Sequence, residues 1–206
     1  MKKVNLILIL FCGFVFTSMS QTVTIGTQVW MTKNLDVSKF RNGDPIPEVK
    51  TDEEWENAGK NKQPAWCYYN NDPKNGEKYG KLYNWYAVSD PRGLAPNGYH
   101  IPSTIEWKIL TKYLSAEPNA GDKMKSKRGW VRKGNGNNSS GFSGLPGGSR
   151  FDEFFAIGTF CAWWSSTEYE SYTYDARSLS LYFNDEVNSN AFSSKENGFS
   201  VRCLRD

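Results

Sequence analysis

Residues 98–107 (GYHIPSTIEW) constrain the fold more than any other part of this chain. The first residues of the segment predict a short strand, and Pro102 keeps the residue before it out of the helical region. Ser103 and Glu106 have the spacing of a capping box, in which each side chain accepts a hydrogen bond from the other residue's backbone N–H. Residues 198–203 (GFSVRC) predict a closing strand near the C-terminus. A strand that leads into a capped helix, followed late in the chain by another strand, predicts a mixed α and β domain.

The remaining pattern places the helices before most of the sheet. Thr51 and Glu54 form a second capping box, for a short helix that ends at Gly59. Large apolar residues at helical spacing predict a helix over 79–88, and Trp107 lies on the apolar face of the helix that follows Ser103. The predicted strands and hairpin lie at residues 22–30, 67–69, 162–165, 176–183, 190–193 and 199–204. This order predicts an α+β fold with a largely antiparallel sheet.

Residues 1–20 have the layout of a secretory signal peptide. Lys2 and Lys3 precede a short apolar run, and small residues lead to a cleavage site near Ser20. Cys12 follows Phe11 where a lipobox requires a small residue, so we do not expect a lipoprotein. The apolar run is also too short to span a bilayer comfortably. The sequence therefore predicts a single domain, residues 21–206, that is secreted or held at the cell surface without a membrane span.

The charge balance argues against nucleic acid as a partner. Loss of Lys2 and Lys3 with the leader leaves 23 basic against 22 acidic residues. A nearly neutral chain has no electrostatic attraction for a phosphate backbone or an anionic membrane surface.

Three cysteines remain after the leader: Cys67, Cys161 and Cys203. In an exported protein this number predicts one disulfide and one free thiol. The residues alone leave all three pairings open.

His100 is the chain's only histidine, so every histidine-dependent mechanism has to use it. It lies between a predicted strand and a predicted helix, where a half-buried imidazole bonded to its surroundings is ordinary. Zinc requires several histidine or cysteine ligands at short spacing, and this sequence has none in such a pattern. We therefore predict a structural role for His100 and neither catalytic residues nor a metal site.

Residues 163–168 (WWSSTE) supply the candidate ligand-binding residues, Trp163, Trp164 and Glu168. A tryptophan ring can lie against the apolar face of a sugar. Because side chains alternate along a strand, one of the two tryptophans has to point into the core.

Two tripeptides resemble the sugar-selecting and calcium-binding motifs of C-type lectins. They are Glu117-Pro118-Asn119 and Phe183-Asn184-Asp185. Carboxylate and amide oxygens would suit calcium. The two tripeptides lie more than sixty residues apart, and the first one falls where a helix needs to end. We predict no cofactor, with calcium as the one ion that these motifs leave open.

Seven segments, taken in order, resemble the Fibrobacter succinogenes major paralogous domain family, which is found in exported proteins of Bacteroidetes and Fibrobacteres. The segments are residues 25–35, 66–72, 79–85, 98–102, 142–148, 163–168 and 200–203. More distantly, residues 101–107 and 198–202 look like the sulfatase-modifying, formylglycine-generating enzymes, whose fold belongs with the C-type lectin-like domains.

The resemblance implies a C-type lectin-like, α+β fold with a small twisted sheet, two or three helices, long loops and termini that come together. It places Ser103, Glu106, Trp107 and Arg202 among the residues that build the scaffold. With the family resemblance in view, we predict a disulfide between Cys67 and Cys203, which leaves Cys161 as a free thiol. The formylglycine-generating enzymes bind copper through two close cysteines, whereas Cys161 has no neighbouring cysteine in this sequence.

These observations predict a non-catalytic binding domain, exported or at the cell surface, whose ligand is a glycan or a protein. A copper-dependent cysteine oxidase that uses Cys161 is the first alternative. A purely structural or adhesive surface module is the second.

Overall fold

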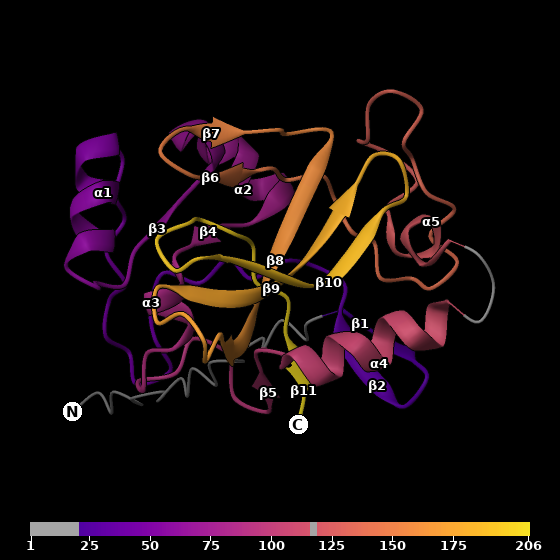
Figure 1. The fold of residues 1–206 in the computed structure, drawn as a ribbon, viewed down its shortest axis with the longest axis horizontal. Coiled ribbons are helices and arrows are strands. Elements are labelled where there is room, and N and C mark those ends of the chain that lie inside the picture. Colours follow the sequence, from indigo (N-terminus) through magenta and orange to yellow (C-terminus); the bar gives the residue numbers. More distant parts are fainter. Residues whose placement is uncertain (1–20, 116–118) are drawn as a thin grey trace, which may run out of the picture.

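The computed structural model describes residues 21–115 and 119–206, which form an α+β domain (Figure 1). Every pair of named strands is antiparallel. The predicted leader, Cys12, Glu117 and Pro118 lie outside the described residues. Among the described helices, none is both long and apolar enough to cross a bilayer.

The first sheet joins the two ends of the domain. Its strands are β1 (Thr22–Ile25), β2 (Gln28–Met31), β11 (Leu204–Arg205) and β5 (Tyr99–His100), in the spatial order β1-β2-β11-β5. Leu204 pairs with Trp30 on one side and with His100 on the other. The C-terminal strand therefore links the N-terminal hairpin to the strand that leads into the capped helix.

That helix is α4 (Thr104–Leu114), and its predicted capping box is confirmed. Glu106 N donates to Ser103 Oγ at 3.3 Å, and Ser103 N donates to Glu106 Oε2 at 2.7 Å. The apolar face buries Trp107, whose ring stacks on Trp30 with 4.6 Å between centroids.

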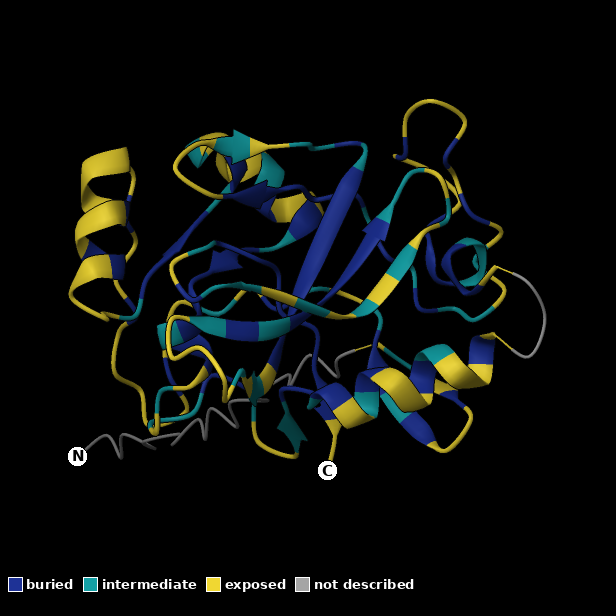
Figure 2. Ribbon diagram, viewed as in Figure 1, coloured by how far each residue is buried: buried dark blue, intermediate teal, exposed yellow. Residues whose placement is uncertain are grey.

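The second sheet has the order β10-β9-β8 and runs through the middle of the molecule (Figure 1). Its strands are β8 (Phe160–Glu168), β9 (Asp175–Tyr182) and β10 (Val187–Ser194). Figure 2 shows β8 buried over most of its length, whereas β10 alternates between intermediate and exposed residues. The strands predicted at 162–165, 176–183 and 190–193 are therefore confirmed, with β8 and β10 longer than expected.

Short elements complete the domain. Two small sheets pair β3 (Trp66–Cys67) with β4 (Leu82–Tyr83) and β6 (Ser149–Arg150) with β7 (Phe154–Phe155). The helices besides α4 are α1 (Asp52–Lys60), a 3₁₀ turn at Tyr69–Asn71, α2 (Pro73–Tyr79), α3 (Trp85–Val88) and α5 (Ala120–Met124). The described chain thus has five α-helices and four sheets, where two or three helices and one small sheet were predicted.

The helix predicted over 79–88 is wrong. Gly80 adopts φ +75° and ends α2, and Tyr83 then donates its backbone N–H to Phe199 O at 2.8 Å as part of β4. Asn84 caps the next helix by accepting from Ala87 N at 3.1 Å. The apolar spacing marked core residues correctly, because Tyr79, Leu82 and Tyr83 are buried. It did not predict their backbone conformation, which changes from helix to strand and back to helix along this segment.

The predicted closing strand is shorter than expected. β11 covers only two residues, while Phe199 and Ser200 each form an isolated bridge, to Tyr83 and Trp163. This segment runs between the sheets and ties β4 and β8 to the N-terminal hairpin.

Candidate ligand-binding surface

Trp163 and Trp164 are both completely buried, so neither ring faces solvent. Their side chains enter different core clusters on the two sides of β8. Trp163 Nε1 donates to Asn34 Oδ1 at 2.8 Å, and Trp164 Nε1 donates to Tyr83 O at 2.7 Å. The expectation that one of them remains available to a ligand is wrong, because both faces of this strand are covered.

Glu168 is exposed, and it holds a loop in place. It forms an ion pair with Lys195, whose side chain is almost fully buried. Lys195 Nζ also donates to Thr173 O at 2.6 Å and lies 4.7 Å from the centroid of the Trp85 ring. Glu168 therefore anchors residues 169–174, the loop between β8 and β9.

His100 joins α4 to the C-terminal segment. Its Nε2 lies 2.8 Å from Glu106 Oε1, and its Nδ1 lies 2.8 Å from Asp206 Oδ1. Burial alone would lower the pKa of His100, but these two carboxylates outweigh it and raise the pKa. The imidazole is thus held between two acids at the seam of the first sheet.

Arg202 is a fully buried cation. Its guanidinium donates to Asn34 Oδ1 at 2.7 and 3.1 Å, to Phe142 O at 2.7 Å and to Met31 O at 3.1 Å. It also lies 4.6 Å from the centroid of the Phe142 ring. Burial lowers the pKa of Arg202 to about 9, so the side chain is still charged at neutral pH. It ties the segment before β11 to β2 and to the loop around Phe142.

The predicted Cys67–Cys203 disulfide is not formed, and that prediction is wrong. Cys67, Cys161 and Cys203 are all free and buried. They lie in three different core clusters, so none is positioned against another. Burial raises the pKa of Cys67 to about 11, of Cys203 to about 12, and of Cys161 well above its usual value.

The copper alternative requires an accessible thiolate pair, and the residues present do not fit it. Cys161 is fully buried in the cluster that contains Trp163, and its thiol is held in the protonated form by burial. Across the part of the chain that the structure describes, no three histidine, cysteine or acidic side chains gather as metal ligands would.

The residues of the lectin-like tripeptides have other roles where the structure describes them. Asp185 forms an ion pair with Lys125, which is completely buried. Asn119 adopts a left-handed conformation before α5. Asp185 is therefore engaged by a cation of the protein itself.

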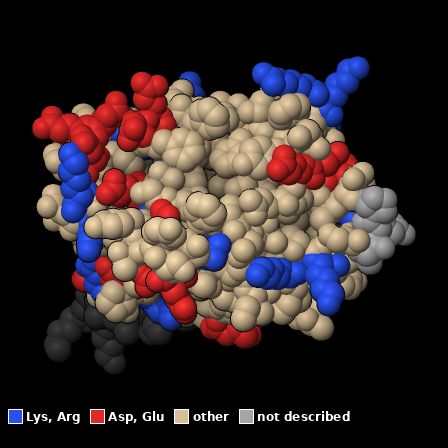
Figure 3. All heavy atoms as spheres, viewed as in Figure 1, with Lys and Arg blue, Asp and Glu red and all other residues tan. Residues whose placement is uncertain are grey.

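A hollow of about 600 Å³ lies on one face of the second sheet, and we call it the β10 hollow. Aromatic rings, amides and hydroxyls form its wall, and Asp175 is its single charged residue. The lining residues are Phe151, Phe160, Asp175, Ser180, Tyr182, Asn188, Asn190, Ala191, Phe192, Ser193, Ser194, Asn197 and Phe199. Figure 3 shows that uncharged residues occupy the centre of the face in view and that acidic side chains gather towards α1.

Several polar groups of the β10 hollow are available to a ligand. Among the described residues, the side chains of Ser180, Asn190 and Asn197 make no hydrogen bond within the protein. A side-chain amide offers both donors and an acceptor, and a hydroxyl offers one donor and two lone pairs. These groups next to ring faces suit a neutral, hydroxyl-rich ligand.

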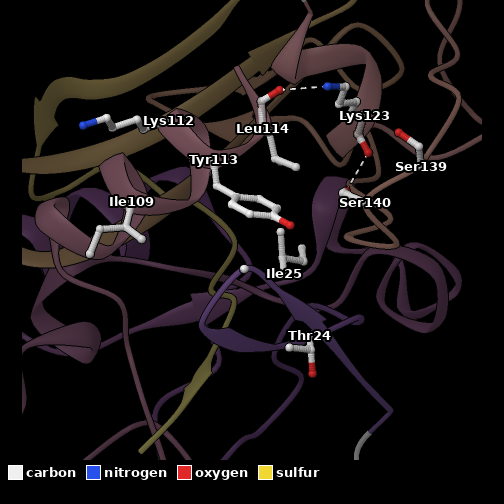
Figure 4. A pocket seen from close by; sticks show the side chains of 10 residues that line it. Thr24, Ile25, Ile109, Lys112, Tyr113, Leu114, Lys123, Ser139 and Ser140 are labelled. Atoms are coloured by element: carbon white, nitrogen blue, oxygen red, sulfur yellow. Dashed lines mark hydrogen bonds between the residues drawn. The ribbon is translucent and has the colours of Figure 1, made fainter. Parts of the chain in front are cut away.

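A larger hollow, of about 860 Å³, lies between the C-terminal half of α4 and the turn of the first hairpin (Figure 4). Two of its polar side chains serve the fold: Lys123 Nζ donates to Leu114 O at 3.0 Å, and Ser140 Oγ donates to Lys123 O at 2.6 Å. The Tyr113 ring packs over Gly26, where a Cβ would lie 3.1 Å from it. Among the described residues that line this larger hollow, Tyr113 is the one aromatic residue and there is no side-chain amide. The β10 hollow is smaller but combines several ring faces with side-chain amides, so we take it as the candidate site.

Sequence reasoning missed this site. Phe192 is 64% exposed in a strand otherwise made of small and polar residues, and that isolated aromatic residue was the available signal. Phe151 and Asn197 come from segments far apart in the chain, and no local pattern brings them to the same hollow.

The fold and site define a class: an α+β domain with an aromatic-rich core and a surface hollow lined by aromatic rings, amides and one carboxylate. The model of the Fibrobacter succinogenes major domain family matches residues 23–205, and the chain belongs to that family. Searches among curated proteins and solved structures found no match.

Proposed function

We propose that this protein is a non-catalytic glycan-binding domain that acts outside the cell or at its surface. The observation that carries the proposal is the β10 hollow, where ring faces stand beside the unengaged side chains of Ser180, Asn190 and Asn197. Ligand sites of this kind combine apolar walls with a few placed polar groups. The leader predicted at residues 1–20 supports export, and the loops and sheets support a C-type lectin-like scaffold.

The composition of the hollow favours a glycan over a protein as ligand. A sugar ring presents an apolar C–H face and a rim of hydroxyls, which match aromatic rings and amides. The hollow contains neither arginine nor lysine, which anionic ligands would require. No cofactor enters the proposal, and Asp185 is occupied by Lys125 rather than free for calcium.

Glycan-array screening of the purified protein, followed by titration calorimetry on any sugar that binds, tests the proposal. Asn197→Ala removes an amide that makes no side-chain hydrogen bond within the protein, so it should weaken binding about fivefold to tenfold and leave folding intact. Asn184→Ala is the matched control, an exposed asparagine outside the hollow, and should bind as the wild type does.

Other outcomes separate the alternatives. Binding that disappears with EDTA would contradict the calcium-free proposal. Tight one-to-one copper binding that is lost in Cys161→Ser would favour the oxidase. If no sugar on the array binds, the glycan proposal fails, and a structural module or a protein-binding domain takes its place.

A further inference from the structure

Three aromatic rings form a cluster beside the β10 hollow, and we call it the Tyr169 cluster: Tyr169, Tyr172 and Phe192. Phe192 stacks on Tyr169 with 5.7 Å between centroids and an interplanar angle of 16°. Tyr172 lies 5.6 Å from Tyr169 on the same measure. Tyr172 is 62% exposed, so much of its surface remains open to solvent. These rings contribute little to the core.

Contacts with neighbouring side chains hold the cluster in place. The Arg177 guanidinium lies 4.1 Å from the centroid of Tyr169, and its Nη1 donates to Asn190 O at 3.2 Å. The ion pair between Glu168 and Lys195 anchors the loop that carries Tyr169 and Tyr172. Rings that are fixed before a ligand arrives lose little conformational freedom on binding.

The hollow and the cluster are continuous. Phe192 lines the hollow and stacks in the cluster, while Asn190 lines both the hollow and a smaller depression of about 290 Å³ beside Tyr169. The pairing of β10 with β9 shifts register between Asn188 and Ala191, the position of a bulge. A bulge redirects side chains locally, and such irregularities are common next to functional sites.

We propose that the ligand is a linear, neutral polysaccharide that occupies the β10 hollow with one part of its chain and crosses β10 to lie against the Tyr169 cluster with another. This inference rests on the proposed glycan-binding function and adds a second subsite to it. A single sugar or a disaccharide placed in the hollow would leave Tyr172 without a contact, because Tyr172 does not line the hollow. A chain of several sugars uses both places at once, and each added contact slows its release.

The test compares disaccharides with hexasaccharides of linear glucose, xylose and mannose polymers by titration calorimetry. In the wild type, the hexasaccharide should bind about tenfold more tightly than the disaccharide of the same series. Tyr172→Ala should remove most of this gain and leave disaccharide affinity within about twofold, since Tyr172 does not line the hollow. Tyr174→Ala is the matched control, a tyrosine of the same loop that is 75% exposed and outside the cluster.

The outcomes distinguish this inference from the function on which it rests. If no oligosaccharide of any length binds, the glycan-binding function fails and the second subsite fails with it. If disaccharides bind and Asn197→Ala weakens them, but length brings no gain or Tyr172→Ala leaves the gain intact, the second subsite alone is refuted. Thermal melts of each variant show whether a loss of binding comes from unfolding.

Discussion

Removing Asn34, which accepts two hydrogen bonds from the buried Arg202 cation, should cost more stability than removing the cation itself. Arg202→Met keeps an unbranched stem but lacks the guanidinium, so it removes four hydrogen bonds and leaves Phe142 O without its 2.7 Å donor. The loss is partly offset, because a charge no longer has to be desolvated. We expect a cost of about 3 kcal/mol, which lowers the melting temperature by roughly 10 °C in a domain of this size.

Asn34→Ala should be worse. Asn34 Oδ1 accepts from Arg202 twice and from Trp163 Nε1, and its Nδ2 donates to Tyr79 O at 2.8 Å. Alanine leaves a buried cation with two of its four hydrogen bonds, together with an unpaired indole N–H and an unpaired carbonyl. The expected cost is about 4 kcal/mol.

Urea denaturation of both single variants and the double variant measures these costs and their coupling. Because the two side chains share their hydrogen bonds, the double variant should fall short of the summed single costs by about 2 kcal/mol. The reasoning is refuted if the two costs add, or if Asn34→Ala costs under about 1 kcal/mol. Equal m-values across the set would show that the unfolded states are comparable.

Three further predictions concern other parts of the domain. The two carboxylates raise the folded-state pKa of His100, so the stability they confer is complete below about pH 6.5 and is lost as pH rises through the folded pKa. His100→Gln should flatten this part of the stability profile, measured by urea denaturation between weakly acidic and weakly basic pH; an unchanged profile would contradict it. Alkylation without reductant, read by mass spectrometry, should leave Cys67, Cys161 and Cys203 unlabelled in the folded protein and should label all three in the unfolded protein. A disulfide-linked peptide would overturn the assignment of three free thiols. Gly121→Ala would place a Cβ 2.3 Å from Asp185 O and should cost about 2 kcal/mol of stability. Gly147→Ala would place its Cβ 3.3 Å from Tyr79 Cβ and should cost about 1 kcal/mol or less. Similar melting temperatures for the two variants would refute the steric explanation.

Local signals in the sequence predicted the helix starts well. Thr51 and Ser103 cap their helices with the reciprocal hydrogen bonds that their spacing implied. Such caps depend on residues within one turn, so the surrounding fold hardly alters them. The strands of the second sheet were also found, because short alternating runs bounded by turns carry the pattern that a sheet needs.

Longer-range features were beyond the sequence. Residues 79–88 have an apolar spacing that suits a helix, but Gly80 and the pairing of Tyr83 with Phe199 divide the segment. Trp164 is buried because Phe199 packs on it, with 4.5 Å between ring centroids, and Phe199 is 35 positions away in the sequence. The predicted disulfide failed for the same reason: no local rule places Cys67 and Cys203 in different core clusters.

The position of the candidate site follows from how the second sheet is covered. Over residues 160–165, β8 is enclosed on both faces by the two large clusters, which include Phe199 and Trp107, so these side chains are buried in the core. β10 is an edge strand of that sheet, and its residues alternate between intermediate and exposed. It is nevertheless fixed in place by its pairing with β9 along most of its length. A strand that is firmly held and only partly covered can present aromatic and amide groups at little entropic cost. We therefore propose β10, rather than the buried pair Trp163 and Trp164, as the place where a ligand binds.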